Sequence, residues 1–254
     1  MKSPIRSRHK SRSAALLKEL IPMGSVIDSF LFFSGEIELS LAHSRRFVCA
    51  HTFNYVIYEF WECAMEDPAA ISEFVISKPF SSFFNKKIFH ILQENWPMYK
   101  DPYVRSALFF VLNRCSSTGA ISSGEFSTTE LTPTAISTLR NFKINNFHLA
   151  LDNSNTLAEA LTLDIKGEYI LLPMPPFAYN FFKEGKQCGH EEIIIDHALI
   201  KRTLDTLEKK WIVVYPKHPQ VLKLYKDYTI RQINKYGNLT DQIDECEEVI
   251  VTNF

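Results

Sequence analysis

A short apolar run that ends in consecutive prolines constrains the fold of this chain more than any other stretch. The run begins at Gly167, and its last residues are Met174, Pro175, Pro176 and Phe177. Its aromatic and branched residues favour a strand, but a strand cannot continue through Pro175 and Pro176, because neither has an N–H to donate. The backbone must therefore leave the sheet there in a stiff turn. Ligands of open α/β sheets bind at the carboxyl ends of strands, so we expect a site at this turn.

Helical and strand patterns alternate from one end of the chain to the other. Apolar patterns predict strands at residues 26–33, 47–50, 145–152 and 212–215. Helical spacing predicts a helix at 14–21 and a long amphipathic helix that begins near residue 195. This alternation predicts an α/β fold with a central sheet. A chain of 254 residues, 46% hydrophobic, can form one large domain, or one domain with an insertion, and bury a full core.

The middle of the chain carries the signals that begin helices. Asp67-Pro68 and Asp101-Pro102 each place an N-cap aspartate before a proline at the first helical position. Residues 116–132 are rich in Ser, Thr and Gly and predict a long loop. We therefore expect residues 55–144 to be mostly helical.

Composition narrows the classes of function. The net charge of −1 gives no overall attraction for nucleic acid, so any DNA contact must be local. No run of 18 apolar residues exists, and the basic N-terminus lacks an apolar signal core, so we expect a cytoplasmic protein with no membrane partner. The five cysteines form no Cys-x-x-Cys pair, which favours reduced structural thiols and no metal.

The first 18 residues form the one local concentration of positive charge. Arg6, Arg8 and Arg12 stand with three lysines ahead of the first acidic residue, Glu19. Such a segment is either a solvated tail or a local contact for DNA phosphates. The sequence leaves both interpretations open.

Met174-Pro175-Pro176-Phe177 resembles the Asp-Pro-Pro-Tyr box of the DNA adenine methylase family. These enzymes transfer a methyl group from S-adenosylmethionine to the exocyclic N6 amine of a flipped-out adenine. The resemblance implies that these four residues are the catalytic box. Met174 replaces the family's aspartate, and a thioether is a weak acceptor for the amine hydrogens. Loss of one such preorganised group costs about 10²–10³ in rate.

Further segments resemble the family's cofactor site. The resemblance assigns cofactor contacts to Lys10 in the opening motif, to the loop after the first predicted strand, and to the position of the family's ribose-binding acid: Lys10, Asp28, Phe30, Ser34, Gly35 and Thr52. Phe32 and Phe33 stand where the family has glycines, and Thr52 replaces the acid. A Cβ in such a loop clashes with the ligand or with the required backbone. We expect a filled pocket and loss of S-adenosylmethionine binding.

The resemblance also divides the chain. Residues 1–54 and 145–254 resemble the Rossmann-like methyltransferase domain, with helices on both faces of its sheet, and 55–144 resembles the inserted target-recognition region. Asn113-Arg114 matches one of the family's motifs in that insertion, and the closing residues 248–254 match the family's last strand. The DNA contacts implied are Arg6, Arg8, Arg12 and Arg114. His197 and His218 also fall in matching motifs, and we expect them to cap or pack because methyl transfer needs no such base.

Three hypotheses follow for the function. The leading one is a methylase-like protein that has lost catalysis and acts as a binding or structural module, with a protein partner. The second is an active or weakly active adenine-N6 DNA methyltransferase. The third is DNA binding without catalysis, through the basic N-terminal segment.

Overall fold

The computed structural model describes residues 2–6, 11–77, 85–117, 119, 121, 124–163, 165–174 and 195–254. Its strands are β1 (Val26–Ser29), β2 (Phe47–Thr52), β3 (Phe147–Leu151), β4 (Tyr169–Pro173), β5 (Lys210–Pro216), β6 (Thr229–Asn234) and β7 (Cys246–Thr252). They form a seven-stranded sheet in the order β3-β2-β1-β4-β5-β7-β6. β7 is antiparallel to both of its neighbours, and the other pairs are parallel. The order of the strands therefore changes direction between β1 and β4, where open α/β sheets bind ligands.

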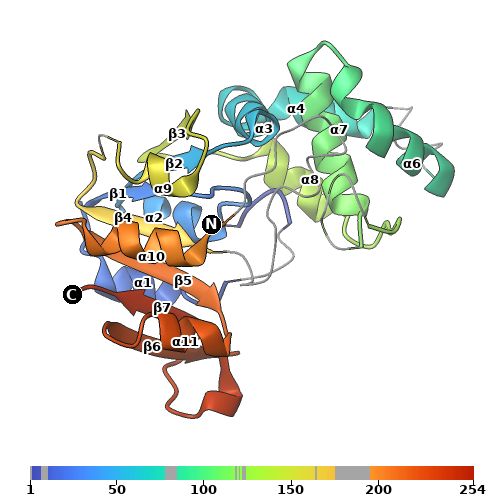
Figure 1. The fold of residues 1–254 in the computed structure, drawn as a ribbon. Coiled ribbons are helices and arrows are strands. Elements are labelled where there is room, and N and C mark those ends of the chain that lie inside the picture. The colour runs from blue at the N-terminus through green and yellow to red at the C-terminus, as the bar shows by residue number, and fades with distance from the viewer. Residues whose placement is uncertain are drawn as a thin grey trace.

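Helices cover both faces of this sheet (Figure 1). On one face lie α1 (Ala14–Leu20), α2 (Glu36–His43) and α3 (Tyr55–Glu66), whose apolar residues share a core with Ile27, Leu171 and Ile212. On the other lie α9 (Leu157–Ala160), α10 (His197–Asp205) and α11 (Pro219–Leu224), which pack on Ile170, Leu172 and Val213. Alternate residues of one strand thus enter opposite cores, as the period of a strand requires. The α/β class predicted from the sequence is confirmed.

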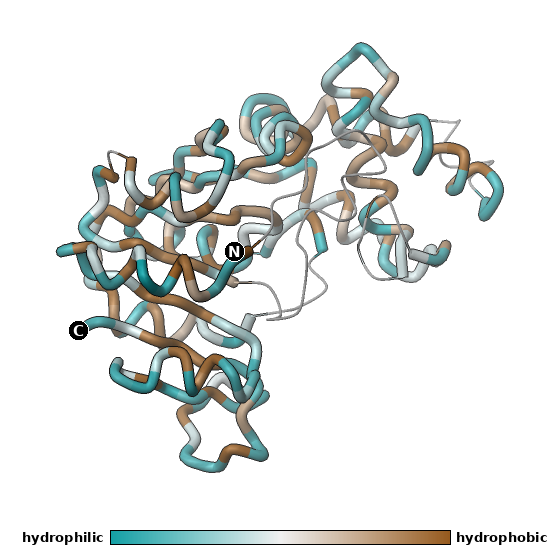
Figure 2. Tube along the Cα trace, in the orientation of Figure 1, coloured by the Kyte–Doolittle hydropathy of each residue, from teal (hydrophilic) through white to brown (hydrophobic). Residues whose placement is uncertain are grey.

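Strand β4 is buried from both sides, because residues 169–172 are all buried. Figure 2 shows the hydrophobic colouring concentrated along the strands in the middle of the sheet. A strand with helices on both faces reads as a continuous apolar run, which is the pattern that the sequence shows here.

The chain between β2 and β3 is mostly helical in the residues that the structure describes. After α3 come α4 (Pro68–Ile76), α6 (Lys86–Asn95), η1 (Trp96–Met98), α7 (Pro102–Cys115) and α8 (Pro133–Arg140), gathered to one side of the sheet in Figure 1. Asp67 accepts a hydrogen bond from Ala70 N–H, and Asp101 accepts two, from Tyr103 and Val104, so both predicted N-caps are confirmed. The division of the chain at residues 54 and 145 stays a prediction. The buried apolar core runs without a break from these helices into the sheet.

The C-terminal histidines cap or pack. His218 is the N-cap of α11, and its Nδ1 accepts a hydrogen bond from Gln220 N–H at 3.2 Å. His197 Nδ1 lies 2.8 Å from the hydroxyl of Tyr215, which is fully buried. Both contacts agree with the structural roles expected of these residues.

Elsewhere, η3 (Ile243–Glu245) precedes β7. No helix in the described parts of the chain is long and apolar enough to cross a membrane.

A buried ion pair joins α7 to α3. Arg105 in α7 donates through Nε to Glu59 Oε1 in α3 at 2.7 Å and through Nη2 to Glu59 Oε2. The two side chains are 18% and 7% exposed, so the charges are largely removed from water. Tyr55 also donates to Glu59 Oε2, at 3.0 Å. The pair fixes how α7 packs against α3.

We expect Arg105→Ala to lower the free energy of unfolding by about 3 kcal/mol, because it leaves a buried carboxylate without its partner. Urea unfolding followed by circular dichroism measures this. Arg140→Ala, at an exposed position in α8, is the control and should cost less than about 0.5 kcal/mol. Equal effects of the two substitutions would mean that the ion pair has no special role.

Candidate functional site

The loop after β1 lies at the point where the strand order changes direction. β1 ends at Ser29, so the predicted strand at 26–33 is shorter than its apolar pattern suggested. Phe30 N–H still donates to Leu171 O in β4 at 3.0 Å, while Phe32 N–H donates to His51 O in β2 at 2.9 Å. The backbone between them crosses from one neighbouring strand to the other. Leu31 makes this turn with a φ of +62°, which is uncommon for a residue other than glycine.

The ring of Phe32 fills the space inside this loop. Phe32 is 1% exposed and packs against Trp61, with ring centroids 5.2 Å apart, and against Phe147, at 5.4 Å. A Cβ added to Gly35, which has a φ of +68°, would lie 2.8 Å from Phe32 Cε2. The indole N–H of Trp61 donates to the carbonyl of Phe33 at 2.7 Å and holds the loop down. The rings of Phe32 and Trp61 therefore belong to the hydrophobic core.

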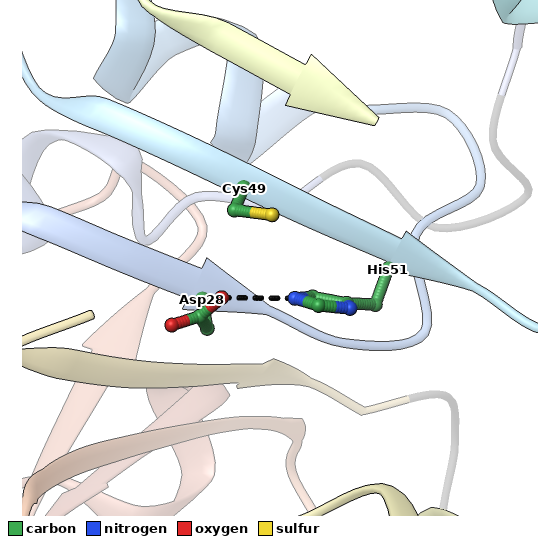
Figure 3. Close-up of side chains that lie close together, drawn as sticks. All are labelled: Asp28, Cys49 and His51. Carbon is green, nitrogen blue, oxygen red and sulfur yellow. Dashed lines mark hydrogen bonds and ion pairs between the residues drawn. The ribbon is translucent and has the colours of Figure 1, made fainter. Parts of the chain in front are cut away.

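Asp28 lies one residue before the end of β1, and its carboxylate joins three strands. Oδ1 lies 2.9 Å from His51 Nε2 in β2, and Oδ2 accepts a hydrogen bond from Gly167 N–H at 2.5 Å, just ahead of β4 (Figure 3). A Cβ on Gly167 would lie 2.6 Å from Oδ2, so glycine is required for this approach. The resemblance assigned Asp28 to the cofactor, but in this structure its two oxygens bond to the protein itself.

The Asp28 and His51 pair is charged. Burial alone would raise the pKa of Asp28, but the hydrogen bonds from His51 and Gly167 hold it below its ordinary value. Burial alone would lower the pKa of His51, and the contacts with Asp28 and Cys49 instead raise it to about 9. The ring of Phe30 stacks on the imidazole, with centroids 4.4 Å apart and planes 12° from parallel. His51 is thus held in place by a carboxylate at its edge and a ring on its face.

The position that matches the family's ribose-binding acid serves a helix start. Thr52 is 1% exposed, and its hydroxyl accepts a hydrogen bond from Asn54 N–H at 3.4 Å. Asn54 is the N-cap of α3 and accepts from Val56 N–H at 2.9 Å. Thr52 therefore supports the turn into α3 and does not project a hydroxyl toward solvent.

The position that matches the catalytic aspartate is part of the core. Met174 is 5% exposed and lies in the apolar cluster that contains Phe30, Leu31 and Leu157. Its N–H donates to Val214 O at 2.8 Å, so the backbone still follows β5 at this residue. Pro175, Pro176, Phe177, Lys10 and Arg8 lie outside the described residues. Ser34 is half-buried in the loop, next to Gly35.

Pro4 and Arg6, in the basic N-terminal segment, bind the C-terminal end of α7. Asn113 accepts from Arg6 N–H at 2.7 Å and donates back to Arg6 O at 3.0 Å. The guanidinium of Arg114 donates to the carbonyl of Pro4, with Nε at 2.9 Å, and that of Arg6 donates to Ser116 O at 3.0 Å. The DNA contacts predicted for Arg6 and Arg114 stay untested, but both side chains bind the protein's own backbone. Arg12 is exposed, and its N–H donates to Glu248 Oε2 at 2.8 Å.

Sequence reasoning interpreted Cys49 as a structural thiol and did not assign His51 to a site. Both belong to β2, two residues apart, so their side chains lie on the same face of the sheet, where Asp28 also lies. Because side chains alternate between the two faces of a strand, the sequence of residues 47–52 already placed Cys49 and His51 on one face. This placement could not be used without knowing that β1 is the neighbouring strand.

Comparisons with known proteins give distant matches among solved structures. No family model and no curated protein matches the sequence. Among solved structures, a TehB-like S-adenosylmethionine-dependent methyltransferase from Corynebacterium glutamicum ATCC 13032 Kitasato is 6% identical, with 96% of this chain and 87% of that chain covered and a TM-score of 0.41. The glycopeptide N-methyltransferase MtfA, complexed with S-adenosylmethionine, is 9% identical, with 95% and 92% covered and a TM-score of 0.38. These scores are too low to support any argument about function.

The order of the strands is enough to assign the fold class of this chain. It adds an antiparallel β7 between β5 and β6 to the 3-2-1-4-5 arrangement of Rossmann-like sheets. The chain is an α/β protein with a Rossmann-like sheet that contains an antiparallel β7. Fold alone does not give the reaction or the substrate, because these depend on the residues of the site.

Glu38 lies behind the loop, on the face of the sheet that α2 covers. It is 4% exposed, and its Oε1 accepts a hydrogen bond from Ser29 Oγ at 2.9 Å. Burial raises the pKa of Glu38 above the ordinary value of 4.5, against the opposing effect of the bond from Ser29. A group with a raised pKa in the folded state stabilises the fold below its unfolded pKa and loses that contribution as the pH rises through the folded value.

We expect Glu38→Gln to remove this loss, because an amide keeps the acceptor and does not ionise. The variant should therefore gain stability relative to the wild type as the pH rises above 4.5. Urea unfolding at pH 4.5 and at about pH 7 measures the change. Glu19→Gln, at an exposed position in α1, is the control. A pH-independent difference between Glu38→Gln and wild type would show that Glu38 does not titrate in this range.

Proposed function

We propose that this chain is a noncatalytic methyltransferase-fold protein of the DNA adenine methylase type that works as a binding module for a protein partner. The observation that carries the proposal is the filling of the loop after β1 by Phe32. In the family that this loop resembles, glycines let the backbone approach the methionine part of the cofactor. Here a buried ring takes that space, and the cofactor cannot enter unless Phe32 leaves the core.

The side chains around the loop support the same proposal. Asp28 would have to give up His51 or Gly167 to bind a ligand, and Thr52 would have to leave the turn before α3. Each of these changes breaks contacts that hold the sheet or start a helix. Several such losses for one cofactor exceed what a single ligand contact restores, since a typical hydrogen bond contributes only about 0.5–1.5 kcal/mol net.

The charges of the described surface favour a protein over nucleic acid as the partner. The chain carries a net charge of −1, and the guanidinium groups of Arg6 and Arg114 donate to backbone carbonyls. Binding of duplex DNA depends on Lys and Arg side chains that are free to contact phosphates. DNA binding without catalysis is therefore less well supported than binding to protein.

We expect no saturable binding of S-adenosylmethionine at concentrations up to about 1 mM. Isothermal titration calorimetry of the full chain measures this, with an active DNA adenine methylase in the same buffer as the positive control. The physical reason is the buried position of Phe32 inside the loop. Micromolar affinity for the cofactor would refute the proposal.

We expect Met174→Asp to leave the protein without methyl transfer and to destabilise it by several kcal/mol, because an unpaired carboxylate would enter an apolar cluster. Met174→Leu nearly conserves the volume and should cost less than about 1.5 kcal/mol. Transfer of a labelled methyl group to adenine-containing DNA and urea unfolding give the two readouts. Transfer by the wild type would overturn the noncatalytic proposal, and transfer by Met174→Asp alone would show that the cofactor pocket had survived.

A further inference from the structure

We propose that Asp28, Cys49 and His51 form a binding site for a divalent transition-metal ion of the zinc type. The carboxylate, thiol and imidazole ligand atoms all lie within 4.8 Å of one another (Figure 3). The site makes no use of a methyltransferase cofactor, so it goes beyond the proposed function.

Two neighbouring parallel strands set the positions of these ligands. Asp28 in β1 is paired in register with Cys49 in β2, and His51 follows Cys49 by two residues on the same face. Ligands on paired strands are held more rigidly than ligands on loops. Tetrahedral zinc sites hold their ligand atoms about 2.0–2.3 Å from the ion, which puts the ligand atoms roughly 3.3–3.8 Å apart. Asp28 Oδ1 and His51 Nε2, which are 2.9 Å apart, would have to separate slightly, and ligand atoms that lie up to 4.8 Å apart would have to move closer.

The chemistry of the ligand set matches a zinc-type ion. Thiolate and imidazole are preferred by zinc and related ions, and carboxylate oxygen completes many of their sites. A thiolate and a carboxylate together bring two negative charges, which balance a divalent cation in a partly dehydrated site. Asp28 is only 5% exposed, whereas His51 is 19% exposed and Cys49 is half-buried. We infer that the ion would enter from the side on which His51 and Cys49 are partly exposed.

The groups around the ligands hold them in place. Gly167 N–H donates to Asp28 Oδ2, which leaves Oδ1 directed toward His51. The ring of Phe30 stacks on the imidazole and restricts its rotation. Such supporting contacts typically change metal affinity by about 10–100-fold. The ion would replace the hydrogen bond between Asp28 Oδ1 and His51 Nε2.

Lys209 is the cation that opposes the site most directly. It adds positive charge near Asp28, and its Nζ donates to the carbonyl oxygens of Ile165 and Gly167, the latter at 2.8 Å. These carbonyls hold the ammonium group on the side of Gly167, away from the oxygen that faces His51. Its charge therefore weakens binding of the ion without occupying its position.

The test is a titration of the reduced, full-length protein with Co²⁺ alone, followed by absorption spectroscopy. We expect saturation at a single equivalent, with visible bands of tetrahedral cobalt and a thiolate-to-cobalt charge-transfer band in the near ultraviolet. Addition of Zn²⁺ should abolish both signals by displacement. Zn²⁺ should also raise the Tm of the wild type, because the ion binds the folded state.

Two ligand variants and one matched control make the result specific. Cys49→Ser should lose the charge-transfer band and the Zn²⁺-dependent rise in Tm, and His51→Gln should lower Co²⁺ affinity by more than about 100-fold. Cys246→Ser removes a buried cysteine in β7 and should leave the spectrum unchanged. Failure of the wild type to bind Co²⁺, or equal spectra for the wild type and Cys49→Ser, would show that Asp28 and His51 form a structural ion pair only. Neither outcome depends on whether S-adenosylmethionine binds.

Discussion

The buried carboxylate of Asp28 is the contact on which the central strands depend. A carboxylate removed from water is tolerated only when it is paired and hydrogen-bonded, and here His51 and Gly167 meet that need from the strands on either side of β1. In the family that the sequence resembles, the acid at this place serves the cofactor. In this protein it holds β2 and the start of β4 to β1. A ligand that used the same carboxylate would have to replace contacts that position the sheet.

The residues of the loop after β1 pack against one another and against α3 and β3, so none of them can be considered alone. Phe32 packs on Trp61 and Phe147, and it also occupies the space beside Gly35. Returning Phe32 to glycine would leave a cavity lined by aromatic rings, and removal of a buried phenylalanine typically costs about 3–5 kcal/mol. The rings and the loop have therefore become one packed unit. Residues in contact are energetically coupled, so substitutions at Phe32, Trp61 and Phe147 should not have additive effects on stability.

Short sequence motifs correctly predicted features that depend on neighbouring residues only, such as helix starts. The helix starts at Asp67 and Asp101 follow from an N-cap residue beside a proline, and both side chains accept the expected hydrogen bonds. The contact between Asp28 and Gly167 spans 139 positions in the sequence, and no local pattern reports it. The predicted length of β1 was wrong for a related reason. Residues 30–33 are apolar because they enter the core as a loop, and an apolar run alone cannot separate that case from a strand.

The positive charges of the N-terminal segment did not predict the contacts that its arginines make. Counting Arg and Lys predicts either a solvated tail or a phosphate contact, but a guanidinium group also satisfies backbone carbonyls, and Arg6 and Arg114 do so here. Residues that pack the core and residues that would contact a ligand also differ in the sheet. β4 and β7 are held by burial on both sides, so their sequence can keep the pattern of the fold while the residues that would contact a cofactor change. On β1 and β2, the ligand atoms of Asp28, Cys49 and His51 lie within 4.8 Å of one another, which is the scale of a single bound ion.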